Sequence, residues 1–422
     1  MSHEKREAHA CAEYWKLSRR GFLGAASGAA ATIALPRVAF ARGGGTPRPT
    51  LVGIFLRGAI DGLSTVVPYG DAGLYTARPN LAVGAPGTTD GAVDLDGYFG
   101  LNPNAAALLT PFQANRLAFV HACGSPDPTR SHFDAMRTME TGTPDNPTST
   151  EAAGWLARHL QSVSPSGTGP LRAIAQNDLM PRVLALAPNS LPIPDPGNFA
   201  LAGAPATEAS RRAAISDAYA RTIEPLRSAA SNTLDSISTL EAIDFAGYVP
   251  ANGAVYPASP FGAVMRNTAA LIKAGIDLEV AHYDYGGWDH HNDQGPLTGT
   301  LAGMLGDLAA GLEAFYLDMQ GMEDRYVLYA KSEFGRRVAE NGSAGTDHGS
   351  GGIMMVMGNR VQGGQVHGVW PTLDPSQLDN GDVRVETDYR DVIAEILTAG
   401  IGGTDLGNVF LGHGTTPLGV VV

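Results

Sequence analysis

Acidic and histidine side chains stand directly beside two strongly apolar segments in the last third of the chain. Glu333 closely follows the apolar run at 326–330, and the pair Asp347 and His348 precedes a second apolar run at 353–357. Short apolar runs bounded by turn residues are typical of buried β-strands. Carboxylates and imidazoles at strand ends are the groups with which open α/β sheets build metal and phosphate sites. The pattern predicts a metal site of the kind that hydrolases use.

A second cluster of histidines and aspartates lies in residues 282–293. Three of the chain's 11 histidines and three aspartates fall in this segment, among them Asp289 and His291. Imidazole nitrogen together with carboxylate oxygen suits Zn²⁺, Mn²⁺ or a similar divalent ion. A solvated loop is the alternative interpretation, and the glycines and the tryptophan beside the histidines argue against it. We therefore expect this segment to supply ligands to one or two ions.

A further carboxylate follows the first apolar run of the chain. Asp61 comes after residues 51–56, in a turn flanked by glycines. A sharp turn of this kind brings the carboxylate to the edge of a sheet, where it can bind a metal. An ordinary turn aspartate is the alternative, and the sequence leaves both open.

Groups that favour anions stand at the start of a predicted helix. Residues 128–133 read Pro-Thr-Arg-Ser-His-Phe, which places Ser131 near the N-cap with Arg130 beside it. Backbone N–H groups and the helix dipole attract an anion there. Ser131 can cap the helix or attack a bound phosphoryl group, and His132 can assist or simply pack. Arg336 is a second candidate for anion binding, unless it pairs with surface acids.

Composition limits the class of protein. The 422 residues are 44% hydrophobic and 17% charged, which is ample for a large core in one domain or two tightly joined ones. A net charge of -13 argues against binding nucleic acid, which requires a basic face. Only Cys123 lies outside the first 41 residues, so we expect no internal disulfide there.

The first 41 residues read as an export signal. Adjacent arginines at 19–20 precede a mildly apolar run, and Ala39-Phe40-Ala41 supplies a cleavage site. We interpret residues 1–41 as a twin-arginine signal peptide and residues 42–50 as a linker. The expected location is the periplasm or outside the cell, with the twin-arginine translocase as a partner during export. The apolar run is too short and too weak for a stable membrane span.

Strand and helix patterns alternate along the rest of the chain. Apolar runs predict strands at 51–56, 117–122, 183–186, 278–280, 326–330 and 353–357, and three- and four-residue periodicity predicts a helix over 297–319. Residues 69–104 are expected to form a surface excursion and residues near 206–245 a helical insert. This alternation favours an α/β fold with a largely parallel sheet that is covered on both faces.

Taken in order, these motifs resemble a large family of exported bacterial proteins with a domain of unknown function, related to sulfatases. The matching segments are the Arg-Gly-x-x-Asp-Gly turn at 57–62, Thr-Arg-Ser-His-Phe at 129–133, Gly-Trp-Asp-x-His at 287–291, Ser-Glu-Phe-Gly-Arg at 332–336 and Thr-Asp-His-Gly at 346–349. That family is grouped with the alkaline phosphatase superfamily. The resemblance covers residues 51–422 and implies an alkaline-phosphatase-like three-layer α/β/α sandwich with a mostly parallel sheet.

The resemblance also implies roles for individual residues. Ser131 corresponds to the superfamily's nucleophile at a helix start, with Arg130 and His132 beside it. The metal ligands implied by position are Asp61 and Glu333 for one ion and Asp289, His291 and His348 for the other, with Asp347 as an additional candidate. The expected substrate is a small anionic ester.

The sequence departs from the superfamily pattern at three places. Phe334 stands where the superfamily has a metal-binding histidine, and a phenyl ring cannot ligate an ion. Asp289 and His291 are closer together than the usual phosphatase pair. Position 126 is proline instead of the cysteine or serine that sulfatases convert to formylglycine. A competing register would align residues 347–349 with the superfamily's Asp-His-Gly, but no apolar strand directly precedes them.

Two hypotheses of different class follow. The first is an exported metal-dependent hydrolase of phosphate or sulfate esters with Ser131 as the nucleophile. The second is a non-catalytic periplasmic binding or assembly protein with a degenerate metal site, which the substitution at Phe334 favours. An α/β-hydrolase is a weaker third, because the chain has no G-x-S-x-G elbow.

Overall fold

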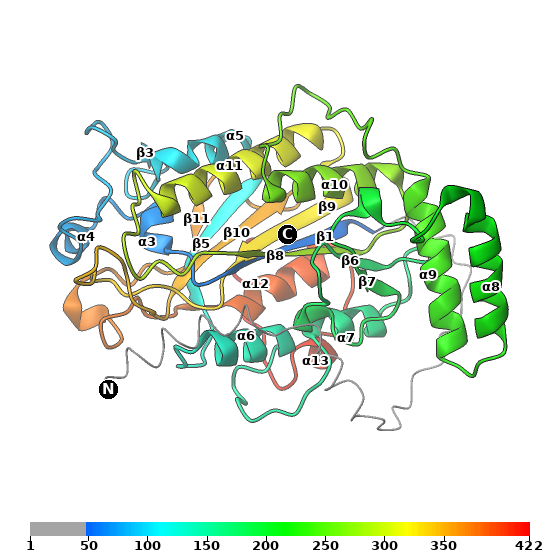
Figure 1. Cartoon of the computed structure of the whole chain (residues 1–422). Helices are drawn as coiled ribbons and strands as arrows, with labels where there is room; N and C mark the ends of the chain where they lie inside the picture. The colour runs from blue at the N-terminus through cyan, green and yellow to red at the C-terminus, as the bar shows by residue number, and fades with distance from the viewer. Residues whose placement is uncertain (1–47) are drawn as a thin grey trace. The chain divides into compact units, whose positions relative to one another are not determined.

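A computed structural model describes residues 48–422 of the chain (Figure 1). The predicted export signal at 1–41 and most of the predicted linker at 42–50 lie outside the described residues. The chain divides into two units, Met1–Phe40 and Ala41–Val422, and every described residue belongs to the second. Within residues 48–422, none of the helices has the length and apolar character needed to cross a membrane.

A nine-stranded sheet forms the centre of this second unit. Its strand order is β11-β5-β10-β9-β1-β8-β6-β7, and β12 also pairs with β5. The strands are β1 (Thr50–Arg57), β5 (Leu117–Gly124), β6 (Ala173–Ala175), β7 (Ser190–Pro192), β8 (Val280–Gly286), β9 (Tyr326–Lys331), β10 (Gly352–Gly358), β11 (Val366–His367) and β12 (Thr387–Asp388). The pairings of β10 with β5 and β9 are antiparallel and the others in this sheet are parallel. The sheet is therefore mixed and mostly parallel.

Alternation along β1 shows why both faces of the sheet are covered. Leu51 and Phe55 pack into one hydrophobic core, whereas Val52, Ile54 and Leu56 pack into another. Successive side chains of a strand point to opposite faces, so a strand that is apolar at every position needs a cover on each side. The predicted α/β class is confirmed by this arrangement.

Helices supply the two covers (Figure 1). One face packs against η1 (Pro103–Leu108), α5 (Leu109–Gln113), α10 (Pro260–Ala274) and α11 (Thr300–Asp318). The other face packs against α6 (His132–Thr141), α7 (Trp155–Ser162), α12 (Tyr389–Glu395), the π-helical η7 (Ile396–Gly400) and α13 (Leu406–Val409). The described residues thus form three layers, with the sheet between two helical layers.

Shorter elements complete the description. The segment predicted as a surface excursion, residues 69–104, holds α4 (Ala72–Ala77), β3 (Val93–Asp94) and β4 (Gly100–Leu101), and part of it is buried. The strands β3 and β4 form a small sheet with β2 (Val66–Val67), which precedes the segment. The predicted helical insert is present as the pair α8 (Glu208–Ala220) and α9 (Leu226–Glu241). The remaining elements are α3 (Gly62–Thr65), η2 (Arg182–Leu184), η3 (Pro196–Asn198), η4 (Pro205–Thr207), η5 (Glu323–Arg325) and η6 (Pro375–Gln377).

Two strand predictions need correction. The strand predicted at 183–186 is wrong, because this segment contains the 3₁₀ turn η2, although Val183 and Leu184 are buried as a core strand would be. The strand predicted at 278–280 begins only at Val280 and continues to Gly286. Residues of the His/Asp cluster at 282–293, including His282 and Asp284, therefore belong to the strand itself.

A buried histidine in β5 predicts how stability depends on pH. His121 is neutral and fully used: Nε2 lies 3.0 Å from the carbonyl of Val66, and the N–H of Ala122 donates to Nδ1. Burial lowers the pKa of His121 to about 4. The unfolded chain binds this proton at a higher pH than the folded one, so stability is lost as the pH falls from about 6.5 to about 4.

We expect His121→Gln to reduce the loss of stability between about pH 6.5 and pH 4. The wild-type loss attributable to His121 is at most about 3.5 kcal/mol, from roughly 1.4 kcal/mol per pKa unit. The measurement is the free energy of unfolding in urea at several pH values between about 4 and 8. If the free energy of unfolding falls equally steeply with pH in the variant, His121 is not the group responsible.

Candidate metal centre

Five chain segments meet at one edge of the sheet. The strands β1, β8 and β9 are parallel neighbours, so the loops that follow them leave from the same edge. Because β10 is antiparallel to both β9 and β5, its amino end and the carboxyl end of β5 also lie there. The antiparallel strand thus brings the loop before β10 to the loops that follow the parallel strands.

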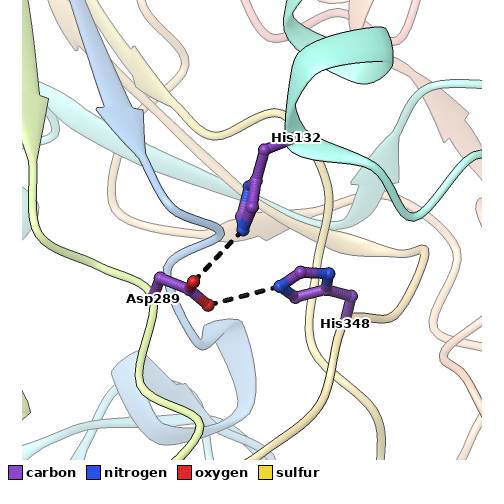
Figure 2. A group of neighbouring side chains, drawn as sticks. All are labelled: His132, Asp289 and His348. Carbon is purple, nitrogen blue, oxygen red and sulfur yellow. Dashed lines mark hydrogen bonds and ion pairs between the residues drawn. The ribbon is translucent and has the colours of Figure 1, made fainter. Parts of the chain in front are cut away.

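Three side chains from these segments form a compact group (Figure 2). His132 is the first residue of α6, Asp289 lies in the loop after β8, and His348 lies in the loop before β10. The Nε2 atom of His132 is 3.5 Å from Oδ2 of Asp289, and Nε2 of His348 is 3.2 Å from Oδ1. Among residues 48–422, these are the three whose ligand atoms lie within 4.8 Å of one another. Two imidazoles and a carboxylate at this spacing suit a divalent ion.

A fourth side chain adjoins the group. The Nε2 atom of His291 lies 3.1 Å from Oδ1 of Asp289 and 2.8 Å from Nε2 of His348. Two imidazole nitrogens at this distance need a shared proton or a cation between them, because two lone pairs repel. His291 therefore contacts two members of the group, although it does not belong to the three whose ligand atoms all lie within 4.8 Å of one another.

The Nδ1 atom of each of these three histidines already has an oxygen partner. In each case Nδ1 lies within hydrogen-bond distance of an oxygen: Oε1 of Glu333 at 2.6 Å from His132, Oδ1 of Asp347 at 3.2 Å from His291, and the carbonyl of Arg130 at 2.8 Å from His348. Metal-binding histidines in proteins show this arrangement, because an acceptor on one nitrogen fixes the ring and leaves the other lone pair for the ion. Nε2 of His132 is buried, and its partner is the carboxylate of Asp289 described above.

The charges around the group favour a cation. Burial alone would lower the pKa of His132, but its hydrogen bonds with Asp289 and Glu333 raise that pKa to about 9. Burial and the charge of Arg336 lower the pKa of His348. Burial would raise the pKa of Asp289, but its contacts with the three histidines and with Arg336 lower it. A half-buried carboxylate beside an imidazole that holds a proton at neutral pH, as His132 does, is a place where a divalent ion can replace that proton.

Arg336 fixes the loops that carry the ligands. Its buried guanidinium donates to the carbonyls of Ala59 and Thr346, both at 2.8 Å, and to Oδ1 of Asp289 at 2.8 Å. It also donates to the carbonyls of Gly58 and Trp288. Arg336 does pair with an acid, the half-buried Asp289, and its role in anion binding stays a prediction. Its donors orient Asp289 and join three loops.

Close backbone approaches explain the glycines of these loops. Gly58 has a φ of 113°, and a Cβ there would lie 2.6 Å from the backbone nitrogen of Asp289. A Cβ on Gly345 would lie 2.3 Å from the backbone of His291. Any larger residue at either position would push the ligand-bearing loops apart.

Glu333 supports a ligand and does not join the group of three. Its side chain is fully buried, and Oε1 accepts from the N–H of Gly58 at 2.8 Å as well as contacting His132. The neighbouring Phe334 stacks on the rings of His132 and His348, with centroids 4.9 Å apart in both cases. An apolar ring therefore lies where the superfamily pattern implied a ligand for a second ion.

Asp61 and Ser131 both lie outside the group of His132, Asp289 and His348. The structure does not bring Asp61 into the group: its buried carboxylate caps α3 and is paired with Arg78 at 2.5 Å, and Gln294 donates to it. Of the two readings of Asp61, the structure matches the turn residue. Ser131 is the N-cap residue of α6, but its side chain makes no capping bond. It therefore stands half-buried beside His132 with its hydroxyl uncommitted to the helix.

Sequence reasoning placed several of these residues near the site and misjudged how they act. His132 is predicted to assist or to pack, and it lies in the group of three that could hold an ion. Glu333 and Asp347 were expected to bind the ion, and each contacts a histidine ligand instead. A carboxylate that ligates and one that orients a ligand have the same sequence pattern, so no signal in the chain could separate them.

The fold and the site define an α/β protein with a candidate mononuclear metal centre at the edge of its sheet. Residues 118–421 match the model of a family described as "Protein of unknown function (DUF1501)", and the chain belongs to that family. The matched region contains the four candidate ligands and Glu333 but not Asp61. Membership confirms the predicted family of unknown function in that coarse form.

Other comparisons add little. No curated protein matches the sequence. One solved structure, that of Ps i-CgsB in complex with k-i-k-neocarrahexaose, is similar over 87% of this chain and 75% of that chain, at 11% identity and a TM-score of 0.36. A score this low carries no argument, and the description of the fold rests on the strand order given above.

We expect Glu333→Gln to weaken metal binding without unfolding the protein. The neutral amide removes the negative charge behind His132, and such changes behind a ligand typically cost about 10- to 100-fold in affinity. The measurement is the Zn²⁺ dissociation constant by chelator competition. Glu340→Gln is the control, because Glu340 bonds Asn80 and Leu81 and none of the candidate ligands. Equal affinities in the two variants would refute the role given to Glu333.

Proposed function

We propose that the chain is an exported metal-dependent hydrolase of phosphate or sulfate esters, with one divalent ion, Zn²⁺ or Mn²⁺, at this centre. The observation that carries the proposal is the convergence of imidazole Nε2 atoms on Asp289, while each Nδ1 is held by an oxygen. His132, Asp289 and His348 would hold the ion, with His291 as a fourth ligand. One ion is preferred over two because Phe334 and the engaged carboxylate of Asp61 leave no second set.

The residues around the centre fit ester hydrolysis. A divalent ion held there would polarise an oxygen of the phosphoryl or sulfuryl group. Ser131 is the candidate nucleophile, because its hydroxyl is at the start of the helix that carries His132 and does not cap that helix. Arg130, 37% exposed at its side chain and paired with Asp382, is the guanidinium available to an anionic substrate.

The second candidate function is a non-catalytic binding or assembly protein that retains one ion. The packing of Phe334 on two of the candidate ligands favours it, because an apolar ring there excludes the second ion that phosphatase-like chemistry uses. Both candidates require the ion, and they differ in whether Ser131 reacts. Export through the twin-arginine pathway and a periplasmic or secreted location remain part of the proposal in either case.

Metal analysis tests the centre first. We expect about one equivalent of Zn or Mn in the protein purified after native export, because the site offers one set of ligands. The Asp289→Ala/His348→Ala double variant should bind none while keeping the wild-type circular dichroism spectrum. A wild-type protein without metal, or one loaded with redox-active iron, would overturn the hydrolase proposal.

Ser131→Ala separates the two candidate functions. If Ser131 attacks the ester, the variant should lose roughly a thousandfold or more in kcat with unchanged metal content. The measurement is turnover of 4-nitrophenyl phosphate and 4-nitrophenyl sulfate. Ser210→Ala, on α8, is the matched control, since Ser210 bonds only its own helix start. Full activity in Ser131→Ala would exclude the nucleophile, and an inert wild-type protein with bound metal would favour the binding role.

A further inference from the structure

We infer that a buried ion-pair network centred on Arg57 positions the side chains of the candidate metal centre. The network consists of Arg57, Glu140 and Asp284, of which Glu140 is outside every motif that suggested a ligand. The inference rests on the proposed metal centre, and it assigns Glu140 as a positioning residue for it.

The network is a doubly paired guanidinium. Arg57 ends β1, and its guanidinium nitrogens lie 3.0 Å and 3.3 Å from the two carboxylate oxygens of Glu140. A guanidinium nitrogen also lies 2.8 Å from Oδ2 of Asp284. The three side chains are 11%, 8% and 17% exposed, so these contacts are poorly screened by water. Fork-like pairing fixes geometry as well as charge.

Each member of the network belongs to an element that carries part of the site. Arg57 is followed by Gly58, whose N–H donates to Glu333 behind His132. Glu140 lies on α6, the helix that begins with His132. Asp284 lies on β8, and the loop after that strand carries Asp289. The network therefore joins the three elements whose relative placement decides whether His132 faces Asp289.

Glu140 also fixes the orientation of α6. Besides Arg57, its Oε1 accepts the N–H of Val183 in the turn η2. His132 and Glu140 are roughly 12 Å apart along the helix axis at 1.5 Å per residue. Pinning the carboxylate near the end of this short helix therefore restrains its rotation, and rotation would move the His132 ring away from Asp289.

The chain offers a matched control pair. Arg172 and Glu279 form a buried fork of the same kind, with contacts of 2.5 Å and 3.1 Å and side chains that are 7% and 5% exposed. Glu279 directly precedes β8, at the opposite end of the strand from the loop with Asp289. The two glutamates thus have the same chemistry and burial but different distances along β8 from the site.

The experiment compares Glu140→Gln with Glu279→Gln in the full chain. Both variants should lower the free energy of unfolding, because each removes a buried carboxylate that is paired with a buried arginine. Only Glu140→Gln should raise the Zn²⁺ dissociation constant, by about tenfold or more. Only that variant should also speed backbone hydrogen exchange in residues 131–135. Equal Zn²⁺ affinities, or equal losses in both variants, would overturn the inference.

Two further outcomes keep this inference separate from the proposed function. A wild-type protein that binds no Zn²⁺ would defeat the metal centre, and the exchange of residues 131–135 would then decide the network alone. If Glu140→Gln does not fold, Arg57→Lys takes its place, since lysine keeps the charge but loses the fork. Arg57→Lys should weaken Zn²⁺ binding more than Arg172→Lys, and an equal effect would count against the network.

Discussion

The guanidinium of Arg336 is the interaction on which the site depends. It lies in the interior among the carbonyls of loops that follow β1 and β8 and that precede β10. Buried carbonyls without donors are costly, and one arginine supplies donors to four of them and to Asp289. Without it, four carbonyls from three distant parts of the sequence would lose a donor at one point.

Further polar contacts fix the side chains and elements around this arginine. Asp289 and the imidazole Nε2 atoms form the centre, and oxygens on the Nδ1 atoms fix the rings around it. Beneath them the Arg57 network joins β1, α6 and β8. Carboxylates thus have three different roles here. Only their surroundings distinguish a candidate ligand from a group that orients a histidine ring or anchors a helix.

The strands that supply the site could be predicted because they are apolar at every position. The runs at 51–56, 117–122, 326–330 and 353–357 all form strands of the central sheet. Their directions could not be predicted, and the antiparallel β10 is what brings His348 to the same edge as Asp289. The run at 183–186 misled because burial alone does not separate a core strand from a buried turn.

The sequence by itself determined which chemical groups are present near strand ends, and the structure brings Asp289, His291 and His348 of that set together. Only the tertiary structure decided their partners. Asp61 is taken up by Arg78, and Glu333 and Asp347 turn to the rings of histidines. The physical reason is that a side chain's role follows from the neighbour it reaches. Those neighbours are set by strand order and loop packing between residues hundreds of positions apart, not by local spacing.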